Sequence, residues 1–274
     1  KEKDEIFLQL MLNEIVYRGP DNSSIFINNS IALGHHRLTI IDPQGGAQPS
    51  FDRETKDCLV FNGEIYGYKK HANYLKKIGI SLLDLSDTEV LFKLLINFGI
   101  EKTLQRVDGM FSFAYYNAKE DSLYLARDRT GEKPLFYSFY KNHLLFGSEV
   151  KTITQFPLLK KKLSYEAIAD YLHLDYISLD KTLIEGINKV QPGQYLKYQN
   201  NRLISRNYWK LNLKFKKDFS EKIALTKLDQ LISQSVRDRL IADVPVGLFL
   251  SGGIDSSLIS YYSKKFSSNI KSFT

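Results

Sequence analysis

One glycine-rich segment near residue 250 has the residue types of a phosphate-binding loop. It follows an apolar run, precedes a helical pattern and reads Leu250-Ser251-Gly252-Gly253-Ile254-Asp255-Ser256-Ser257. At the start of a helix, successive backbone N–H groups and the positive end of the helix dipole converge, which favours an anion. The segment therefore predicts an anion site between a strand and a helix.

Other phosphate-binding motifs fit this segment less well. It has no lysine at the Walker A position and does not match the pattern G-x-G-x-x-G. Neither a P-loop kinase nor a dinucleotide-binding fold is therefore indicated. The alternative is structural, namely a glycine turn in which Asp255 or Ser256 caps the following helix.

A second group of short segments contains side chains suited to binding one small zwitterion. Arginine pairs with a carboxylate, acidic side chains accept from an ammonium group, and an asparagine amide can donate to an oxyanion. Each segment alone also has a structural explanation, such as a surface ion pair, an Asn-Gly turn or a capped helix start. The segments are Arg18-Gly19-Pro20-Asp21, Gly34-His35-His36-Arg37-Leu38, Phe61-Asn62-Gly63-Glu64-Ile65-Tyr66 and Ser86-Asp87-Thr88-Glu89.

The chain up to about residue 208 is predicted to be a mainly antiparallel sheet region. Short alternating segments are separated by hairpin turn residues. The clearest helix is predicted over residues 86–98, where Ser86 and Glu89 form a capping box and Gly99 marks the stop. We expect such helices to cover the sheets. The predicted strands span residues 24–27, 31–38, 59–61, 111–117, 122–127, 135–140 and 143–147.

The pattern changes near residue 215. After a polar stretch over 211–218, an amphipathic helix is predicted from about 220 to 241, followed by a buried strand over 246–250 and the glycine loop. Strand, loop and helix in this order indicate the beginning of an α/β domain, of which one strand and one helix are expected here. Two domains are therefore predicted, over residues 1–210 and 218–274.

The composition excludes several classes of protein. No apolar stretch is long enough to span a bilayer, no signal-peptide segment follows the charged start, and the single cysteine, Cys58, excludes an internal disulfide framework. We therefore expect a cytoplasmic protein without membrane contact. The formal charge is +7, but the basic runs at 160–162 and 214–217 are short and separated, so no nucleic-acid partner is expected.

The order of these segments resembles the asparagine synthetase family of glutamine-dependent amidotransferases. The zwitterion segments resemble the class II glutaminase domain, and Ser-Gly-Gly-x-Asp-Ser-Ser resembles the loop of the PP-loop ATP pyrophosphatases. The resemblance covers essentially the whole chain. Further matching segments are Asp108-Gly109-Met110-Phe111, Arg127-Asp128-Arg129-Thr130-Gly131-Glu132-Lys133-Pro134-Leu135, Phe146-Gly147-Ser148-Glu149-Val150-Lys151 and Asp243-Val244-Pro245-Val246-Gly247.

For residues 1–210 the resemblance implies the α+β N-terminal-nucleophile fold, a sandwich of antiparallel sheets covered by helices. It implies that Arg37 binds the α-carboxylate of glutamine and that Asp87 receives its α-ammonium group, with Glu64 nearby. The side-chain amide of Asn62 and the backbone N–H of Gly63 would form the oxyanion hole.

For residues 218–274 the resemblance implies a truncated α/β PP-loop domain that cleaves ATP between its α and β phosphates. Cleavage would convert a carboxylate substrate into an acyl-adenylate with a good leaving group. Ammonia would reach this adenylate internally, and homodimers occur in the family. The implied ATP-binding residues are Leu250, Ser251, Gly252, Gly253, Asp255, Ser256 and Ser257, with Asp255 placing Mg²⁺.

The nucleophile of such glutaminases is a cysteine at the mature N-terminus, whose α-amine acts as the base. No residue here matches it, so we expect its strand upstream of Lys1 and expect the chain to be a fragment lacking both ends. Cys58 lies in a predicted strand away from any terminus and is expected to be structural. His35 and His36 point to opposite faces of a strand, so they are not expected to share a metal ion.

The acceptor of the ammonia stays open. Aspartate, which gives asparagine, AMP and pyrophosphate, is the commonest case, but relatives amidate sugar acids of surface polysaccharides or close a β-lactam ring. The set of Arg37, Asn62-Gly63 and Asp87 argues against β-lactam synthetases, whose glutaminase half is degenerate. The segment 251–257 argues against class II glutaminases without a PP-loop. A non-catalytic homologue would be expected to have lost the glutamine-site residues together with the cysteine.

Overall fold

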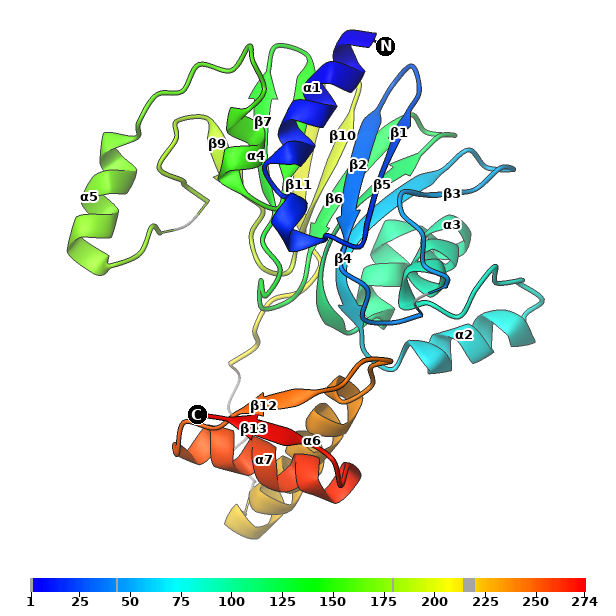
Figure 1. Ribbon diagram of the computed structural model, residues 1–274, viewed down its shortest axis with the longest axis vertical. Helices are drawn as coiled ribbons and strands as arrows, with labels where there is room; N and C mark the ends of the chain where they lie inside the picture. The colour runs from blue at the N-terminus through cyan, green and yellow to red at the C-terminus, as the bar shows by residue number, and fades with distance from the viewer. Residues whose placement is uncertain (1, 43, 179, 214–219) are drawn as a thin grey trace. The chain divides into compact units, whose positions relative to one another are not determined.

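The computed structural model describes residues 2–42, 44–178, 180–213 and 220–274 (Figure 1). The chain divides into two compact units. The first consists of Lys1–Thr39 and Gln44–Lys210, and the second consists of Ile40–Pro43 and Leu211–Thr274. The basic run at 214–217 and the domain start predicted at residue 218 lie outside the described residues. No helix within the described ranges has the length and apolar character needed to cross a membrane.

Antiparallel sheets form the centre of the first unit. One sheet has the strand order β11-β10-β6-β5-β4-β3, another has β8-β7-β9, and β1 pairs with β2. The strands are β1 Asn22–Ile27, β2 Ala32–Arg37, β3 Ser50–Phe51, β4 Cys58–Ile65, β5 Gly109–Asn117, β6 Ser122–Arg127, β7 Phe136–Tyr140, β8 His143–Gly147, β9 Ile187–Lys189, β10 Gln194–Gln199 and β11 Arg202–Asn207.

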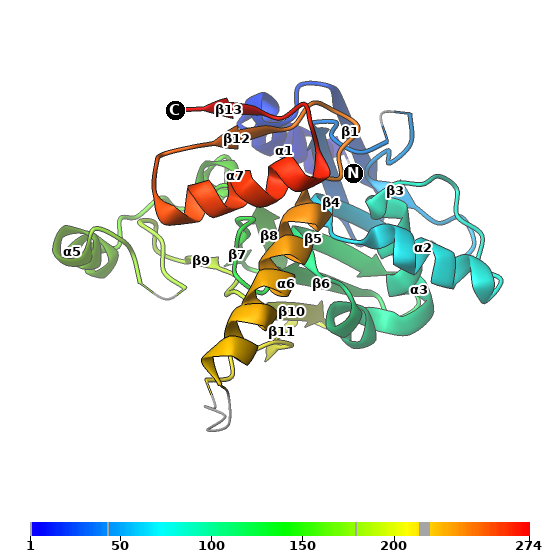
Figure 2. The same ribbon diagram turned by 90° about the horizontal axis from the view of Figure 1, so that it is seen from below.

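Helices cover the outer faces of these sheets (Figures 1 and 2). α3 packs against β4 with α2 beside it, whereas α1 packs against β2 and α4 against β8. The main core lies between the sheets, because Leu33 of β2, Val60 of β4 and Leu125 of β6 belong to one buried cluster. The predicted sandwich of antiparallel sheets covered by helices is therefore confirmed. The helices of this unit are α1 Glu2–Asn13, η1 Val16–Arg18, α2 Tyr68–Lys77, α3 Asp87–Arg106, α4 Val150–Thr154 and α5 Tyr165–Leu174.

Every predicted strand of this unit is present, with small shifts at the ends. β4 is longer than predicted because its pairing with β5 continues from Cys58 to Ile65. β3, β9 and the hairpin formed by β10 and β11 were not predicted from the sequence. The hairpin turn contains Asn200 and Asn201, both at positive φ, and such a pair is a recognisable signal for a tight turn.

The helix predicted to stop at Gly99 is longer than expected. Gly99 leaves the helical conformation, with φ 75° and ψ 173°, but the helix resumes and α3 ends at Arg106. Ser86 caps α3 as predicted, since its hydroxyl accepts a hydrogen bond from the Glu89 N–H at 3.1 Å. The second half of the predicted capping box is wrong. The Glu89 carboxylate accepts from the N–H of Leu83 at 3.1 Å instead of from Ser86.

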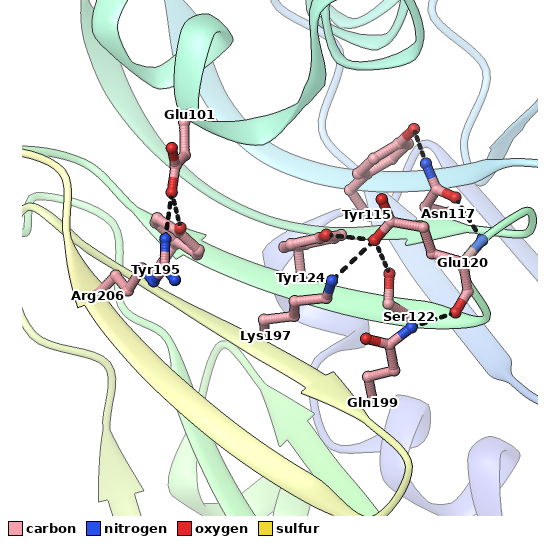
Figure 3. Close-up of polar contacts among 10 residues, drawn as sticks. All are labelled: Glu101, Tyr115, Asn117, Glu120, Ser122, Tyr124, Tyr195, Lys197, Gln199 and Arg206. Carbon is pink, nitrogen blue, oxygen red and sulfur yellow. Dashed lines mark hydrogen bonds and ion pairs between the residues drawn. The ribbon is translucent and has the colours of Figure 1, made fainter.

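Aromatic and polar side chains tie the neighbouring strands β5, β6 and β10 of the large sheet together (Figure 3). The rings of Tyr115, Tyr124 and Tyr195 follow one another across β5, β6 and β10, with centroids 6.0 and 6.3 Å apart. The carboxylate of Glu120 accepts hydrogen bonds from Tyr124 Oη at 2.9 Å and from Lys197 Nζ at 2.8 Å. Cross-strand pairs of this kind stabilise strand register. These contacts therefore also fix the position of β5, which pairs with β4.

The second unit contains a parallel strand–helix–strand element. β12 (Gly247–Phe249) pairs with β13 (Lys271–Phe273), α7 (Ile254–Phe266) connects them, and α6 (Glu221–Arg239) packs on α7. The expectation of one strand and one helix was incomplete, because β13 was not predicted. The predicted burial of residues 246–250 is wrong. Phe249 is 90% exposed, since β13 is the only strand paired with β12 in the described part of the chain.

Candidate functional site

The residues predicted to bind a zwitterion all lie in the first unit, on β2, β4 and α3. Arg37 is the last residue of β2, and Asn62, Gly63 and Glu64 follow one another in β4. Asp87 is the first residue of α3. β2, β4 and α3 are neighbours in the sandwich, so the fold brings together residues that are far apart in the sequence.

The guanidinium group of Arg37 lies beside the start of α3. A Cβ atom added to Gly46 would lie 3.0 Å from Arg37 Nη2 and 3.1 Å from Ser86 Cβ. Gly46 also has a φ of +64°, a conformation that favours glycine. Arg37 and Ser86 therefore meet at Gly46, and Ser86 directly precedes Asp87.

Asp87 is a buried carboxylate next to a second acidic side chain. It is 5% exposed, and its Oδ2 atom accepts a hydrogen bond from the Ile65 N–H at 2.9 Å. Burial raises the pKa of Asp87 to about 6, and the charge of Glu64 adds to this effect. Burial also raises the pKa of Glu64, although the charge of Lys133 opposes it. Two neighbouring carboxylates in such a place favour a bound cation.

The side-chain amide of Asn62 is a buried donor at the middle of β4. Within the described residues its Nδ2 atom has no hydrogen-bond partner. Leaving such a donor unsatisfied costs about 1–3 kcal/mol, and an exception of this kind often marks a functional group. An anionic oxygen bound here would satisfy the amide.

Gly63 is fixed by a close approach of two strands. It lies opposite Phe111 in the β4–β5 ladder, and its φ is +150°. An added Cβ would lie 2.0 Å from the carbonyl oxygen of Met110, so no other residue fits without moving a strand. The backbone next to Asn62 is therefore held by steric constraint from β5.

His35 supports the strand that carries Asn62. Its Nε2 lies 3.1 Å from the carbonyl oxygen of Phe61. Burial lowers the pKa of His35 to about 4, so the ring is neutral at pH 7 and donates from Nε2 to this oxygen. His36 Nε2 instead lies 3.1 Å from the carbonyl oxygen of Leu12. The prediction that the two histidines serve different faces is confirmed.

A further predicted segment, at 18–21, is bound both to the segment at 146–151 and to the C-terminal end of β2. Arg18 pairs with Glu149 at 3.0 Å, which joins the segment at 18–21 to the segment at 146–151. The carboxylate of Asp21 accepts a hydrogen bond from the Thr39 N–H at 2.8 Å, and the Asp21 N–H donates to the carbonyl oxygen of Arg37 at 3.1 Å. These contacts fix the backbone at Arg37.

The segment at 127–135 is organised by a fully buried aspartate. Asp128 accepts backbone hydrogen bonds from Phe111 at 3.2 Å, from Glu132 at 2.9 Å and from Lys133 at 3.0 Å. Asp128 thereby joins this loop to β5 opposite Gly63. The role of this segment in the described structure is to support the β4–β5 pair.

The glycine loop lies in the second unit and opens α7 as predicted. Gly252 has a φ of +77°, and Gly253 is the N-cap residue. The structural alternative predicted that Asp255 or Ser256 caps the helix. This alternative is wrong, because the N-cap is Gly253. Ser251 Oγ and Ser256 Oγ lie 3.1 Å apart across the loop. The first N–H groups of a helix have no intrahelical partner, so this loop presents both hydroxyl and backbone donors.

Cys58 has no access to solvent and belongs to the core cluster between the sheets. Burial raises the pKa of its thiol to about 12, so the nucleophilic thiolate does not form at neutral pH. The structural interpretation of Cys58 is confirmed. In the described part of the chain, no three His, Cys, Asp or Glu side chains are arranged to hold a metal ion.

Two residues next to Arg37 and Ser86, Asp84 and Gly46, were not predicted from the sequence. One signal was available for Asp84. It stands two residues before the N-cap Ser86, and an aspartate at this spacing commonly accepts hydrogen bonds from nearby backbone. Gly46 gives no comparable signal, because its contact with Arg37 is formed only in the folded chain.

Each of the two parts of the chain matches a known protein family. Residues 1–209 match the family described as glutamine amidotransferase domain, and residues 227–274 match the family described as asparagine synthase. The first match contains all the residues predicted to bind glutamine, and the second contains the glycine loop.

Curated relatives of the chain include asparagine synthetases and an amidase. The chain is 34% identical over 277 residues to asparagine synthetase (glutamine-hydrolyzing) 1 of Bacillus subtilis (strain 168), covering 100% of this chain and 43% of that protein. It is 30% identical to asparagine synthetase B of Escherichia coli (strain K12), covering 91% and 40%. It is also 34% identical to amidase chry2 of Gibberella zeae, covering 92% and 38%. The chain thus spans about two fifths of the length of these relatives.

A solved structure has a similar fold. The glutamine phosphoribosylpyrophosphate amidotransferase from B. subtilis aligns with a TM-score of 0.54 and 16% identity, covering 97% of this chain and 62% of that one. At this identity the likeness concerns the fold alone. Together with the family match, it confirms the predicted N-terminal-nucleophile fold for the first unit.

Proposed function

The chain belongs to the glutamine amidotransferase domain family, and on this premise we propose that it serves glutamine-dependent asparagine synthesis. Residues 1–210 are proposed as the glutaminase domain and residues 218–274 as the beginning of the ATP-pyrophosphatase domain. The observation that carries the proposal is the unpaired amide of Asn62, in the same part of the first unit as Arg37 and the buried Asp87. The activity of the whole protein is part of this proposal.

Glutamine binding in the proposal uses opposite charges. Arg37 binds the α-carboxylate, for which a guanidinium fork gives two parallel hydrogen bonds. Asp87 accepts from the α-ammonium group, and the neighbouring charge of Glu64 strengthens this attraction. Support comes from the raised pKa of Asp87, because burial and Glu64 both penalise its charge until a cation binds.

Hydrolysis in the proposal uses the amide of Asn62 and the backbone N–H of Gly63 as oxyanion donors. A nucleophile attacks the side-chain carbonyl of glutamine, and negative charge collects on that oxygen. In glutaminases of this type the nucleophile is an N-terminal cysteine, and collapse of the intermediate leaves a thioester and ammonia. Preorganised donors stabilise the charge as it forms, and removal of one typically lowers the rate by about 10²- to 10³-fold.

The second unit would supply ATP chemistry. Ser251, Gly252, Gly253, Ser256 and Ser257 are proposed to bind the phosphates through hydroxyl and backbone donors, with Leu250 at the entrance of the loop. A bound Mg²⁺, for which Asp255 is the proposed carboxylate ligand, would neutralise phosphate charge. The exposed first turn of α7 supports the proposal, because the first N–H groups of a helix have no intrahelical partner and can bind an anion.

Aspartate is the proposed acceptor, and another carboxylate is the second candidate. The second candidate is kept because of one observation. The chain is as similar to the Gibberella zeae amidase as to the first Bacillus subtilis synthetase, at 34% identity in both cases. Sequence identity over this chain therefore does not discriminate between acceptors.

Transfer of ¹⁵N from amide-labelled glutamine to aspartate by the full-length protein, with Mg-ATP, tests the proposal. The expected result is labelled asparagine with one AMP for each asparagine, measured by mass spectrometry. Glutamate release without labelled asparagine would reject aspartate and retain the glutaminase. No glutamate release would reject the proposed hydrolysis as well.

A further inference from the structure

One carboxylate outside the proposed glutamine contacts joins two segments of the site. Asp84 lies in the loop before α3 and is half-buried. Its Oδ2 atom accepts a hydrogen bond from the Gly46 N–H at 2.8 Å. Its Oδ1 atom accepts from the N–H of Ser86 at 2.9 Å and from the hydroxyl of Ser86 at 2.6 Å. Each oxygen of Asp84 is thus committed to a different segment.

The two segments held by Asp84 position opposite charges. Gly46 contacts the guanidinium group of Arg37, as shown by the 3.0 Å separation of an added Cβ from Nη2. Ser86 is the N-cap of α3 and directly precedes Asp87. Movement of either segment would change the separation between Arg37 and the Asp87 carboxylate.

The charge state of Asp84 suits this role. Burial alone would raise its pKa, but the hydrogen bonds from Ser86 and Gly46 and the charge of Arg37 outweigh burial and lower it. Asp84 is therefore ionised at neutral pH, and a carboxylate that accepts several hydrogen bonds holds them more strongly than a neutral group.

We propose that Asp84 is a positioning residue for the binding of an L-α-amino acid, because it sets the separation between Arg37 and Asp87. This inference rests on the proposed function, in which these two residues bind the α-carboxylate and the α-ammonium group. Asp84 itself does not touch the ligand. A ligand that has both charged groups gains from the fixed separation, whereas a ligand that lacks the ammonium group does not.

The substitution Asp84→Asn tests this with little change in shape. An asparagine side chain has one acceptor oxygen, so it can serve Ser86 or Gly46 but places an NH₂ group against the N–H of the other. We expect the dissociation constant of L-glutamine, measured with the 274-residue chain by isothermal titration calorimetry, to rise about tenfold. A change of less than twofold would overturn the inference.

A second ligand separates positioning from general loosening. Glutaramate has the side chain and carboxylate of glutamine but no α-ammonium group. We expect Asp84→Asn to leave its dissociation constant within about twofold of the wild-type value, because it does not use the Asp87 end. An equal loss of affinity for glutamine and glutaramate would overturn the inference.

Asp170→Asn is the matched control, since Asp170 on α5 ties a helix to a loop by accepting from Ser178 Oγ at 2.6 Å. The glutamine affinity of Asp170→Asn should equal that of the wild type.

Asp84→Ser is the second variant for the case that Asp84→Asn does not fold. Its hydroxyl can hold the local turn but not Gly46, and the same tenfold loss is expected. Absence of glutamine binding by the wild-type chain would reject the proposed function, and this inference with it.

Discussion

A carboxylate with a pKa of about 6, as burial and Glu64 give Asp87, changes its charge in mildly acidic solution. The α-ammonium group of glutamine stays protonated over this range, so binding should follow the charge of Asp87. We predict that the dissociation constant of glutamine is nearly constant above pH 7 and rises about tenfold for each pH unit below 6. Calorimetry at pH 5, 6 and 7.5 measures it.

Glu64→Gln provides the control for this pH dependence. Removing the charge of Glu64 should lower the pKa of Asp87, because that charge is one of the effects that raise it. The midpoint of the binding profile should then move to lower pH. A wild-type profile that is flat between pH 5 and 7 would contradict the proposed contact between Asp87 and the ammonium group.

The same carboxylate should destabilise the folded chain at neutral pH. The folded-state pKa of Asp87 is raised above its ordinary value of 3.8, so its contribution to stability is complete below pH 3.8 and is lost as the pH rises through about 6. We predict that Asp87→Asn raises the free energy of unfolding by about 1–3 kcal/mol at pH 7.5. Urea denaturation at two pH values measures this.

At pH 4 the same substitution should have little stabilising effect, because Asp87 is then protonated in the folded chain. The variant should also lose glutamine binding at pH 7.5, because the amide has no negative charge for the ammonium group. Lower stability of Asp87→Asn at both pH values would show that the carboxylate is needed for the fold instead.

At the residue scale, the sequence indicates which residue types could bind a zwitterion but not their environment. Arg37, Asn62 and Asp87 could be selected because they stand in recognisable segments. The pKa of Asp87 and the unpaired amide of Asn62 could not be predicted, since both depend on burial by distant elements. Asp84 could be predicted as a helix-start residue, but its bond to Gly46 could not.

At the scale of elements, the close approach of β4 and β5 fixes the backbone at the candidate oxyanion donors. We predict that Gly63→Ala lowers the free energy of unfolding by about 3 kcal/mol, because its Cβ would lie 2.0 Å from the Met110 oxygen at a φ of +150°. Chemical denaturation of the purified variant measures this.

Gly79→Ala is the matched control for that substitution. Gly79 also has a positive φ, +85°, but no atom lies within 4 Å of an added Cβ. Its cost should be limited to backbone strain, about 1 kcal/mol. Equal losses at the two positions would mean that strand contact at Gly63 is not the dominant effect.

Most elements with local signals were predicted, although the hairpin of β10 and β11, whose turn contains Asn200 and Asn201, was missed. Features set by distant partners could not be predicted. The hairpin of β7 and β8 was predicted because its turn residues and alternation lie within a dozen residues. The continuation of α3 beyond Gly99 was not, because a glycine after an amphipathic helical pattern commonly marks the end of a helix. Here buried contacts of Ile100 and Leu104 hold the second half of the helix.

At the scale of the whole molecule, the two units differ in how much apolar surface they bury. The first unit encloses a core between two sheet layers. In the second unit Phe249, Ile254 and Phe273 are more than half exposed. The sequence correctly predicted a strand, loop and helix there, but burial of the strand was wrong because burial depends on which other strands and helices cover it.

This difference predicts unequal protection of the backbone against hydrogen exchange. Amides of β4 and β5 should exchange only on global unfolding, since both strands are paired and buried. Amides of β12 should exchange by local opening, because a sheet of two short strands with exposed side chains has little stability of its own. We expect β12 to exchange at least about 100-fold faster than β4 in exchange followed by mass spectrometry. Equal protection would mean that the exposed apolar side chains of the second unit are covered in solution, for example by a second copy of the chain, and the protection of β12 should then fall on dilution.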